Sequence, residues 1–249
     1  MFKKLIRKIT QQDKVDELKL SISLKDEMIE SLRKDNEELV KNSNFKNTED
    51  QRAEYWNNHF KKRAVVYTAE EKYKRDVRTY LIDKSDLLMD VLVKNNLISN
   101  DIYETIYNIE QWVIKNIRYK SDPNTGMDYW KEGEYTLQDS FGDCEDGNML
   151  IKSLCLVAKI PDYMVKVVAG YVEDPNNEKN TVGHCYCIVL TEESKWVVSD
   201  FCYFPTTLKI NKRIEHKADK RYNKPIWFTF TKEFGFADEE VNIEGRIRN

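Results

Sequence analysis

The sequence has no apolar run that approaches the roughly 20 residues a membrane-spanning helix needs. Its basic start, residues 1–8 (MFKKLIRK), is not followed by the apolar stretch and cleavage site of a secretory signal. A basic excess is also absent, because the net charge is −3, so no global field favours nucleic acid. We expect a cytoplasmic protein without a membrane span and without a nucleic-acid partner.

Cysteine, histidine, glycine and proline are all scarce. The 5 cysteines are odd in number and include no CxxC pair, so they fit free thiols better than the disulfide framework of a secreted protein. Of the 3 histidines, His59 and His216 lie among charged residues, and we predict that both are on the surface. Residues 54–62 and about 70–97 contain no glycine or proline, and their composition predicts helices.

Residues 14–41 repeat apolar side chains with a period of seven, the pattern of a coiled coil. The a positions are Val15, Ile22, Ile29 and Asn36, and the d positions are Leu18, Lys25, Leu32 and Leu39. Branched residues at a with leucine at d favour a parallel pair of helices. We therefore expect a homodimer through residues 14–41. The alternative is one amphipathic helix packed on its own domain.

The character of the chain changes three times, which predicts four regions. Residues 1–41 are an N-terminal helix, and a polar stretch after it opens a linker and helical region over 42–100. Helical spacing, followed by the period of two typical of strands, marks an α+β domain over 101–237, and a polar tail covers 238–249. In the domain, Asp101 would cap a helix whose apolar stripe is Ile102, Ile106, Ile109, Val113 and Ile117.

A cysteine between acidic residues, in residues 141–148 (FGDCEDGN), is the feature that points to chemistry. Asp143 suits the N-cap of a buried helix that ends before Pro161, which places Cys144 in the first turn. Unpaired backbone N–H groups and the helix dipole favour an anion there, and a thiolate is an anion. A single cysteine is more often a small buried apolar residue, so a nucleophile also needs a base and a group that orients the base.

A predicted hairpin near the end of the domain supplies both groups. Residues 184–191 and 196–201 alternate in the manner of strands, and a loop of five residues joins them. In that register Asp200 lies diagonal to His184 on one face, about 7–8 Å away and within side-chain reach. Asp200 could then hold the imidazole in one tautomer. The sequence therefore predicts a triad of Cys144, His184 and Asp200.

These pieces together resemble the transglutaminase-like cysteine peptidase superfamily. They are residues 142–146 (GDCED), the helix ending in Ile160-Pro161, 169–171 (AGY), 183–184 (GH) and 196–200 (WVVSD), and they occur in the family's order. Residues 128–130 (DYW) to Leu137, ahead of GDCED, look most like its bacterial transglutaminase-like cysteine proteinase branch, and 112–119 (WVIKNIRY) looks like the helix that precedes its core. The resemblance covers roughly residues 101–205.

The resemblance implies a papain-like α+β fold, in which a nucleophile helix packs on an antiparallel sheet. It also implies Cys144 as the nucleophile, His184 as the base and Asp200 as the orienting carboxylate. The oxyanion hole would use the Cys144 backbone N–H and an upstream donor, for which Trp130 and Tyr129 are the candidates.

The implied activity is that of a thiol-dependent hydrolase or acyltransferase acting on amide bonds of protein or peptide substrates, with no cofactor required for the chemistry. Water as acceptor would give proteolysis or deamidation, and a lysine amine would give cross-linking by the same triad. Gly147 and Asn148 depart from the aromatic and small residues common in related helices, which bears on the substrate class. The alternative is a non-catalytic coiled-coil interaction or structural protein with this fold, but the intact Cys144, His184 and Asp200 argue against it.

A zinc site is another alternative to the triad. His184, Cys185, Cys187 and Cys202 are close in sequence. Tetrahedral zinc needs ligands that converge from one side, and strand alternation turns Cys185 and Cys187 away from His184. Cys155 lies on the predicted helix of the nucleophile and is expected in the core.

Calcium is suggested by the acidic residues beside the nucleophile. Asp143, Glu145 and Asp146 place three carboxylates next to a residue that should become an anion, which opposes thiolate formation. The simplest interpretation is that they suit a helix N-terminus. A hard cation would remove the conflict, and some members of the resembled branch depend on calcium through acidic residues flanking the nucleophile. The hypothesis is that calcium binds through Asp143 and Glu145, with Asp146 as a further candidate ligand.

Overall fold

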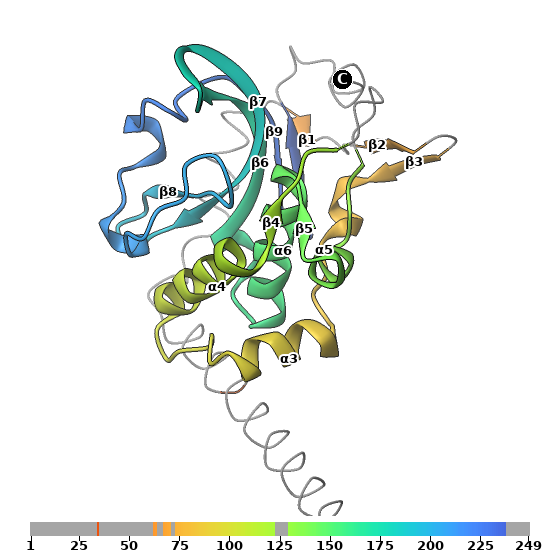
Figure 1. Ribbon diagram of the computed structural model, residues 1–249. Coiled ribbons are helices and arrows are strands. Elements are labelled where there is room, and N and C mark those ends of the chain that lie inside the picture. Colours follow the sequence, from red (N-terminus) through yellow and green to blue (C-terminus); the bar gives the residue numbers. More distant parts are fainter. Residues whose placement is uncertain (1–33, 35–61, 64–66, 71–72, 123–128, 238–249) are drawn as a thin grey trace, which may run out of the picture.

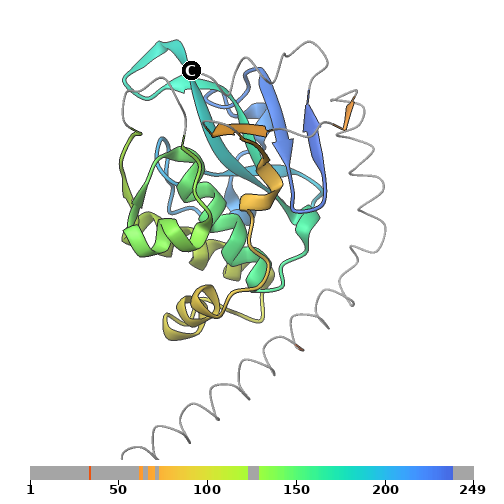
Figure 2. The same cartoon turned by 90° about the vertical axis from the view of Figure 1, so that its right-hand side faces the viewer.

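An antiparallel sheet with helices packed on one side forms the centre of the fold (Figures 1 and 2). The computed structural model describes residue 34 and residues 62–63, 67–70, 73–122 and 129–237. The strand order is β1-β10-β9-β6-β7-β8, and every neighbouring pair is antiparallel. The strands are β1 (Lys62–Arg63), β6 (Val165–Asp174), β7 (Asn177–Leu190), β8 (Trp196–Ser199), β9 (Ile226–Phe230) and β10 (Gly235–Ala237).

Helices and two small strand pairs complete the described part. The α-helices are α3 (Asp86–Lys94), α4 (Ile102–Asn116), α5 (Gly133–Asp139) and α6 (Cys144–Val157). Strands β2 (Tyr67–Glu70) and β3 (Tyr73–Asp76) form an antiparallel hairpin, and β4 (Arg118–Tyr119) and β5 (Phe141–Gly142) form a parallel pair. Short 3-10 turns cover Val77–Tyr80, Asp162–Met164, Ile210–Lys212 and His216–Ala218. The β4–β5 pair fixes the chain directly before α6.

Helix α4 begins where the sequence predicts. Asp101 is its N-cap, and the Asp101 side chain accepts hydrogen bonds from the backbone N–H groups of Tyr103 and Glu104. The apolar stripe from Ile102 to Ile117 is buried. A cap contributes roughly 1 kcal/mol, whereas truncating one buried isoleucine to alanine costs about 2–5 kcal/mol. The stripe therefore does more than the cap to hold α4 in place.

Helix α6 lies at the centre of the core and carries Cys144 as its first residue. Residues 145–157 are all buried, including Lys152. The Lys152 ammonium pairs with Asp162 at 2.8 Å, and Asp162 also accepts two backbone N–H groups from the turn after β9. A buried charge needs such a partner, and this one fixes the C-terminal half of α6 to the sheet. The predicted helix is confirmed and ends at Val157.

The region before residue 101 differs from the prediction. Strands β2 and β3 occupy part of this region, and among the described residues of the helix predicted over 70–97 the α-helix present is α3. Leu81 and Leu92 are buried in the same apolar core as α6. Composition missed the hairpin because the absence of glycine and proline is compatible with a strand as well as with a helix. The structural unit thus begins ahead of the expected domain boundary.

The hairpin of β7 and β8 has the predicted register. Leu190 pairs with Trp196, as a five-residue loop requires. Strand β7 is longer than predicted, because it begins at Asn177 and pairs with β6 along its length. Alternation along β7 turns Cys185 toward the core on the α6 side and Tyr186 toward the opposite face.

Two apolar clusters fill the two faces of the sheet. The larger one joins α3, α4 and α6 to one face. The second lies on the other face and includes Tyr186, Ile188 and Tyr222, the last of them from the segment between β8 and β9. That segment therefore covers part of the sheet opposite the helices.

Some predictions fall on residues that the structure does not describe. The coiled coil over 14–41 lies outside the described residues except for Lys34, and so does the tail over 238–249. Within the described residues, no helix combines the length and the apolar character needed to cross a bilayer.

Candidate active site

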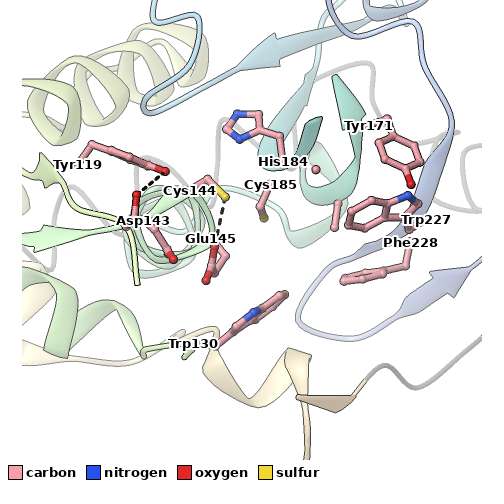
Figure 3. A pocket seen from close by; sticks show the side chains of 13 residues that line it. Tyr119, Trp130, Asp143, Cys144, Glu145, Tyr171, His184, Cys185, Trp227 and Phe228 are labelled. Atoms are coloured by element: carbon pink, nitrogen blue, oxygen red, sulfur yellow. Dashed lines mark hydrogen bonds between the residues drawn. The ribbon is translucent and has the colours of Figure 1, made fainter. Parts of the chain in front are cut away.

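A cavity of about 350 Å³ opens where the N-terminus of α6 meets strands β6, β7 and β9 (Figure 3). Cys144 and His184 both line it, so two members of the predicted triad face the same space. The other lining residues are Tyr119, Ser121, Trp130, Asp143, Glu145, Ala169, Tyr171, Gly183, Cys185, Trp227 and Phe228. Carboxylates thus lie beside the sulfur, and aromatic rings line another part of the wall.

Cys144 is the first residue of α6, and Asp143 is its N-cap as predicted, although the Asp143 side chain makes no capping hydrogen bond. The Cys144 thiol donates to Glu145 Oε2 at 3.2 Å. Burial, and after it the negative charge of Glu145, raise the pKa of the Cys144 thiol well above its usual value. In these surroundings the sulfur is a neutral thiol and not a thiolate.

His184 and Asp200 are joined across the hairpin. His184 Nε2 lies 2.9 Å from Asp200 Oδ2, and both side chains are fully buried. Among the described residues, His184 Nδ1 has no hydrogen-bond partner. Figure 3 shows the ring above the Cys144 sulfur. Because Asp200 occupies Nε2, Nδ1 is the ring nitrogen left for a second partner.

Asp200 is surrounded by hydrogen-bond donors. Besides His184, the Tyr222 hydroxyl donates to Asp200 Oδ2 at 2.6 Å. The backbone N–H groups of residues 202–204 donate to the same carboxylate at 3.0, 3.4 and 3.2 Å. Burial on its own raises the pKa of Asp200, but His184, Tyr222 and the Cys202 N–H together hold that pKa below its usual value. The carboxylate is therefore ionised at neutral pH.

Tyr203 restrains the histidine ring. The two rings are stacked, with 3.9 Å between the ring centroids of Tyr203 and His184 and 4° between their planes. A parallel contact at this distance leaves the imidazole little room to rotate. Tyr203 thus helps to keep Nε2 on Asp200 and Nδ1 on the side of the cavity.

Asn148, one of the two residues that depart from the family pattern, bridges the first turn of α6 and strand β7. Its Nδ2 donates to the backbone oxygen of Cys144 at 2.8 Å and to that of Cys185 at 2.9 Å. Cys185 directly follows His184 on β7. One side-chain amide therefore sets the spacing between the first turn of α6 and the strand that carries the base.

Gly147 is the second departure, and close packing explains it. A β-carbon at Gly147 would lie 2.2 Å from the ring of Phe201. Only glycine permits this approach, and Phe201 directly follows Asp200 in the chain. The contact brings the end of the hairpin onto α6 one turn from the nucleophile.

Three carboxylates converge beside the nucleophile. Oxygens of Asp122, Asp143 and Glu145 lie within 4.8 Å of one another, and the last two residues are buried. Asp146, the further candidate ligand, is not part of this cluster. The Lys131 N–H donates to Asp146 Oδ1 at 2.9 Å, and Lys131 Nζ lies 3.3 Å from Asp146 Oδ2. Asp122, and not Asp146, is the third carboxylate of this cluster.

The cysteines do not form the alternative zinc site. None of the five cysteines, all within the described residues, is in a disulfide, and Cys185 and Cys187 are buried in the cluster on the α6 side of the sheet. The remaining group of close metal-binding side chains in the described residues is His184, Asp200 and Cys202, which contains the His–Asp pair itself. Neither Cys185 nor Cys187 belongs to a close metal-binding group among the described residues.

The two candidates for a second oxyanion donor differ in position. Trp130 lines the cavity and is 7% exposed. Its ring packs among Tyr80, Phe228 and Phe230, with centroids 6.1–6.3 Å apart. Tyr129 is 39% exposed and does not line the cavity. Of the two candidates, only Trp130 therefore lines the cavity.

The prediction that His216 is a surface residue is wrong. His216 is buried, and its Nε2 lies 2.8 Å from the Tyr186 hydroxyl. Charged neighbours in sequence misled the prediction, because the 3-10 turn at 216–218 folds back onto the sheet. Cys155 is fully buried, as predicted, and His59 lies outside the described residues.

The sequence analysis missed three residues that contact the site. Asp122 joins the carboxylate cluster, Tyr203 stacks on the imidazole, and Tyr222 donates to Asp200. None of them belongs to a helix or strand. Periodicity and motif spacing carry no signal for such positions, because tertiary packing alone brings them to the cavity.

Comparisons with known proteins found a family model and several distantly similar solved structures. Residues 94–201 match the family model of the Transglutaminase-like superfamily. LapG from Legionella pneumophila has 18% identity and a TM-score of 0.46, over 66% of this chain and 85% of LapG. Its calcium-bound structure has 16% identity and a TM-score of 0.47, over 66% and 90%. A candidate cysteine protease from Cytophaga hutchinsonii has 18% identity and a TM-score of 0.39, over 67% and 58%. No curated protein matches the sequence.

The likeness to the solved structures is distant, so the family assignment depends on the match to the family model. The matched part runs from the end of α3 to the residue after the hairpin, and it contains α4, α6, β6, β7 and β8. It also contains Cys144, His184 and Asp200. Residues 94–201 are a transglutaminase-like superfamily domain.

Proposed function

We propose that this protein is a thiol-dependent hydrolase of amide bonds in protein or peptide substrates, with Cys144 as nucleophile, His184 as base and Asp200 as orienting carboxylate. The observation that carries the proposal is the buried bond of 2.9 Å between His184 and Asp200, beside the cavity that Cys144 also lines. Taking ionised groups out of water costs several kcal/mol each. Ionisable groups held against that cost gather at functional sites.

In the proposed reaction, His184 Nδ1 takes the proton of the Cys144 thiol, and the thiolate attacks the substrate carbonyl carbon. The Cys144 N–H at the start of α6, with Trp130 as the candidate second donor, faces the oxyanion. The imidazolium, held by Asp200, gives its proton to the leaving amine, and a thioester remains. Water deprotonated by His184 then attacks the thioester, which releases the acid and restores the thiol.

Whether water or an amine takes the acyl group from the thioester can be measured. The same thioester would pass to a lysine amine in a transglutaminase-type reaction. Incubation with a peptide library and a primary amine separates the two outcomes. We expect shortened or deamidated peptides as the main products, and predominant incorporation of the amine would instead assign the protein to the acyltransferase type.

We also propose that calcium binds through Asp122, Asp143 and Glu145. Calcium–oxygen distances are about 2.3–2.6 Å, so oxygens on opposite sides of one ion lie about 5 Å apart. The three carboxylates fit that size, since their oxygens lie within 4.8 Å of one another. Bound there, calcium would supply positive charge next to the sulfur. Glu145 would become a ligand, and the Cys144 thiol that now donates to it would be released toward His184.

The test of the hydrolase is labelling with a thiol-directed probe that mimics an amide substrate, read by peptide mass spectrometry at neutral pH. We expect Cys144 to react faster than the other four cysteines in the presence of millimolar calcium. His184→Ala should slow this reaction sharply at a similar melting temperature, and Cys144→Ala supplies the background. Equal reactivity of all five thiols in the folded protein would refute the proposal.

A partner is also proposed for residues 14–41: a second copy of the chain in a parallel coiled coil. The support is the heptad pattern of the sequence. Light scattering of the full chain at tens of micromolar should give twice its mass of 29.6 kDa. Ile22→Glu, at a core position of the heptad, should give the single mass. A monomeric full chain would overturn this proposal.

A further inference from the structure

Tyr222 reaches the active site from a part of the chain that the family match does not include. It lies between β8 and β9, beyond residue 201. The Tyr222 side chain is 1% exposed, and its hydroxyl donates to Asp200 Oδ2 at 2.6 Å. His184 Nε2 lies 2.9 Å from the same oxygen. Tyr222 and His184 therefore share one oxygen of one carboxylate.

The turn that carries Tyr222 is fixed by its own hydrogen bonds. The Tyr222 N–H donates to the backbone oxygen of Asp219 at 3.0 Å. The Asp219 carboxylate accepts hydrogen bonds from Nε and Nη2 of Arg221 at 2.9 and 2.6 Å. The backbone oxygen of Arg221 in turn accepts the N–H of Glu173, on the central strand β6, at 2.8 Å. These hydrogen bonds thus hold the segment that carries the hydroxyl against the sheet, and a site residue requires such support.

The other donors to the carboxylate fix Oδ2 less directly. The N–H groups of Cys202 and Tyr203 both face Oδ1, at 3.0 and 3.4 Å. Only the N–H of Phe204 reaches Oδ2, at 3.2 Å. The Tyr222 hydroxyl makes the shortest contact to the carboxylate, and O–H donors to a charged oxygen at such distances form strong bonds. Without this hydroxyl, Oδ2 would keep only His184 Nε2 and the longer contact from the Phe204 N–H, so its position would be less restrained.

We propose that Tyr222 is a positioning residue of the reaction, whose hydroxyl keeps Asp200 Oδ2 in line with His184 Nε2 so that Nδ1 stays turned toward Cys144. The inference rests on the proposed function, because this orientation matters only if the imidazole exchanges a proton with the thiol. Tyr222 does not line the cavity, so its effect passes through Asp200.

The experiment compares Tyr222→Phe with Tyr186→Phe in the full chain. Each substitution removes one hydroxyl from a fully buried tyrosine and keeps the ring. The Tyr186 hydroxyl bonds to His216 Nε2 at 2.8 Å and not to the carboxylate, which makes it a matched control. The measurements are the rate of nucleophile labelling by the amide-mimic probe, the melting temperature, and the downfield proton NMR signal of the base Nε2–H. Loss of that signal in His184→Ala assigns it.

Tyr222→Phe should slow labelling about tenfold, the effect expected from losing one hydrogen bond to a charged group. Its Nε2–H signal should broaden and exchange faster with water, because the carboxylate is no longer restrained. Tyr186→Phe should lower the melting temperature by a similar amount, with labelling within about twofold of wild type and the NMR signal in place. Both variants are measured well below their melting temperatures.

The outcomes separate this inference from the proposed function. Equal labelling rates and equal NMR signals in the two tyrosine variants would overturn the role of Tyr222. A wild-type chain that labels Cys144 no faster than its other cysteines would overturn the hydrolase. In that case the NMR comparison alone would still decide whether Tyr222 holds the His184–Asp200 pair.

Discussion

The two sides of the Cys144 sulfur have opposite effects on the pKa of the ionisable groups they contact. On the histidine side, His184 and several hydrogen-bond donors hold the pKa of Asp200 below its usual value despite burial. On the acidic side, Asp143 and Glu145 add to the effect of burial and raise the pKa of the thiol. The histidine side therefore stabilises the Asp200 carboxylate, whereas the acidic side opposes formation of a thiolate at Cys144.

Coulomb's law indicates why the first side does not offset the second. Two unit charges 4 Å apart interact by about 4 kcal/mol at an effective dielectric constant of 20. An imidazolium at His184 would attract a thiolate, whereas Asp143 and Glu145 repel it, and the Glu145 carboxylate lies 3.2 Å from the sulfur. The carboxylates and burial thus favour a neutral thiol, and the proposed calcium ion would offset the carboxylate charge. The state of the sulfur therefore depends on the acidic side as well as on His184 and Asp200.

The largest effect should follow from disabling the histidine side. Asp200→Asn keeps the shape of the side chain but removes the charge that stabilises the imidazolium and selects its tautomer. We expect labelling of Cys144 to fall about a thousandfold or more. Calcium should still raise the melting temperature of this variant, because the acidic side is unchanged. Labelling at the wild-type rate would mean that the histidine side contributes nothing to the reactivity of Cys144.

A smaller effect, of opposite sign, is expected from the acidic side. Glu145 raises the pKa of Cys144, so Glu145→Gln lowers that pKa and increases the thiolate fraction at neutral pH. In chelator we expect labelling to rise about tenfold, equivalent to roughly one pKa unit. Millimolar calcium should raise both the labelling rate and the melting temperature of the wild type, and neither should change appreciably in the variant.

Asp139→Asn is the matched control for the calcium response. It removes a carboxylate of α5 that lies 3.3 Å from Lys131 Nζ and is not part of the carboxylate cluster. Its response to calcium should equal that of the wild type. If Glu145→Gln also responds like the wild type, calcium does not bind through Glu145, and the cluster only supplies charges at a helix terminus.

Local patterns predicted the parts of the fold that local physics determines. The cap at Asp101 and the stripe behind it fixed α4, because both act within a few residues of one another. The five-residue loop fixed the register of β7 and β8. Strands β2 and β3 and the first part of β7 were missed, since their strand character depends on pairing partners that composition does not reveal.

The same division applies to the site. Cys144, His184 and Asp200 lie on elements with readable periods, and the bond between the last two is present. Asp122 and Tyr222 come from connecting segments, and only the folded chain brings them to the cavity. Sequence reasoning was therefore least complete for the acidic side, which Asp122 joins, and for the contacts that hold Asp200, which include Tyr222.

A third prediction concerns the distance between the two sides. Asn148→Leu removes both hydrogen bonds that tie the first turn of α6 to β7 and roughly keeps the volume of the side chain. We expect labelling of Cys144 to fall about fivefold, which corresponds to roughly 1 kcal/mol of lost positioning. Ser153→Ala is the control on the same helix, because Ser153 Oγ accepts the N–H of Ile82 at 3.1 Å, away from the cavity. Equal labelling losses in both variants would mean that general stability, and not spacing, is responsible.

The smallest effect on labelling is expected at the aromatic wall, which belongs to neither charged side. Trp227 meets Tyr171 edge-on at 5.0 Å and covers Gly183, where a β-carbon would lie 2.7 Å from the indole. Trp227→Ala should leave labelling by a small probe within about twofold of wild type. In competition between peptides, it should shift preference toward bulky apolar side chains by about tenfold, and Gly183→Ala should shift it toward small ones. If Trp227→Ala instead changes labelling by the small probe as much as Glu145→Gln does, the wall takes part in setting the charge at Cys144, and the division of the cavity into two sides is too simple.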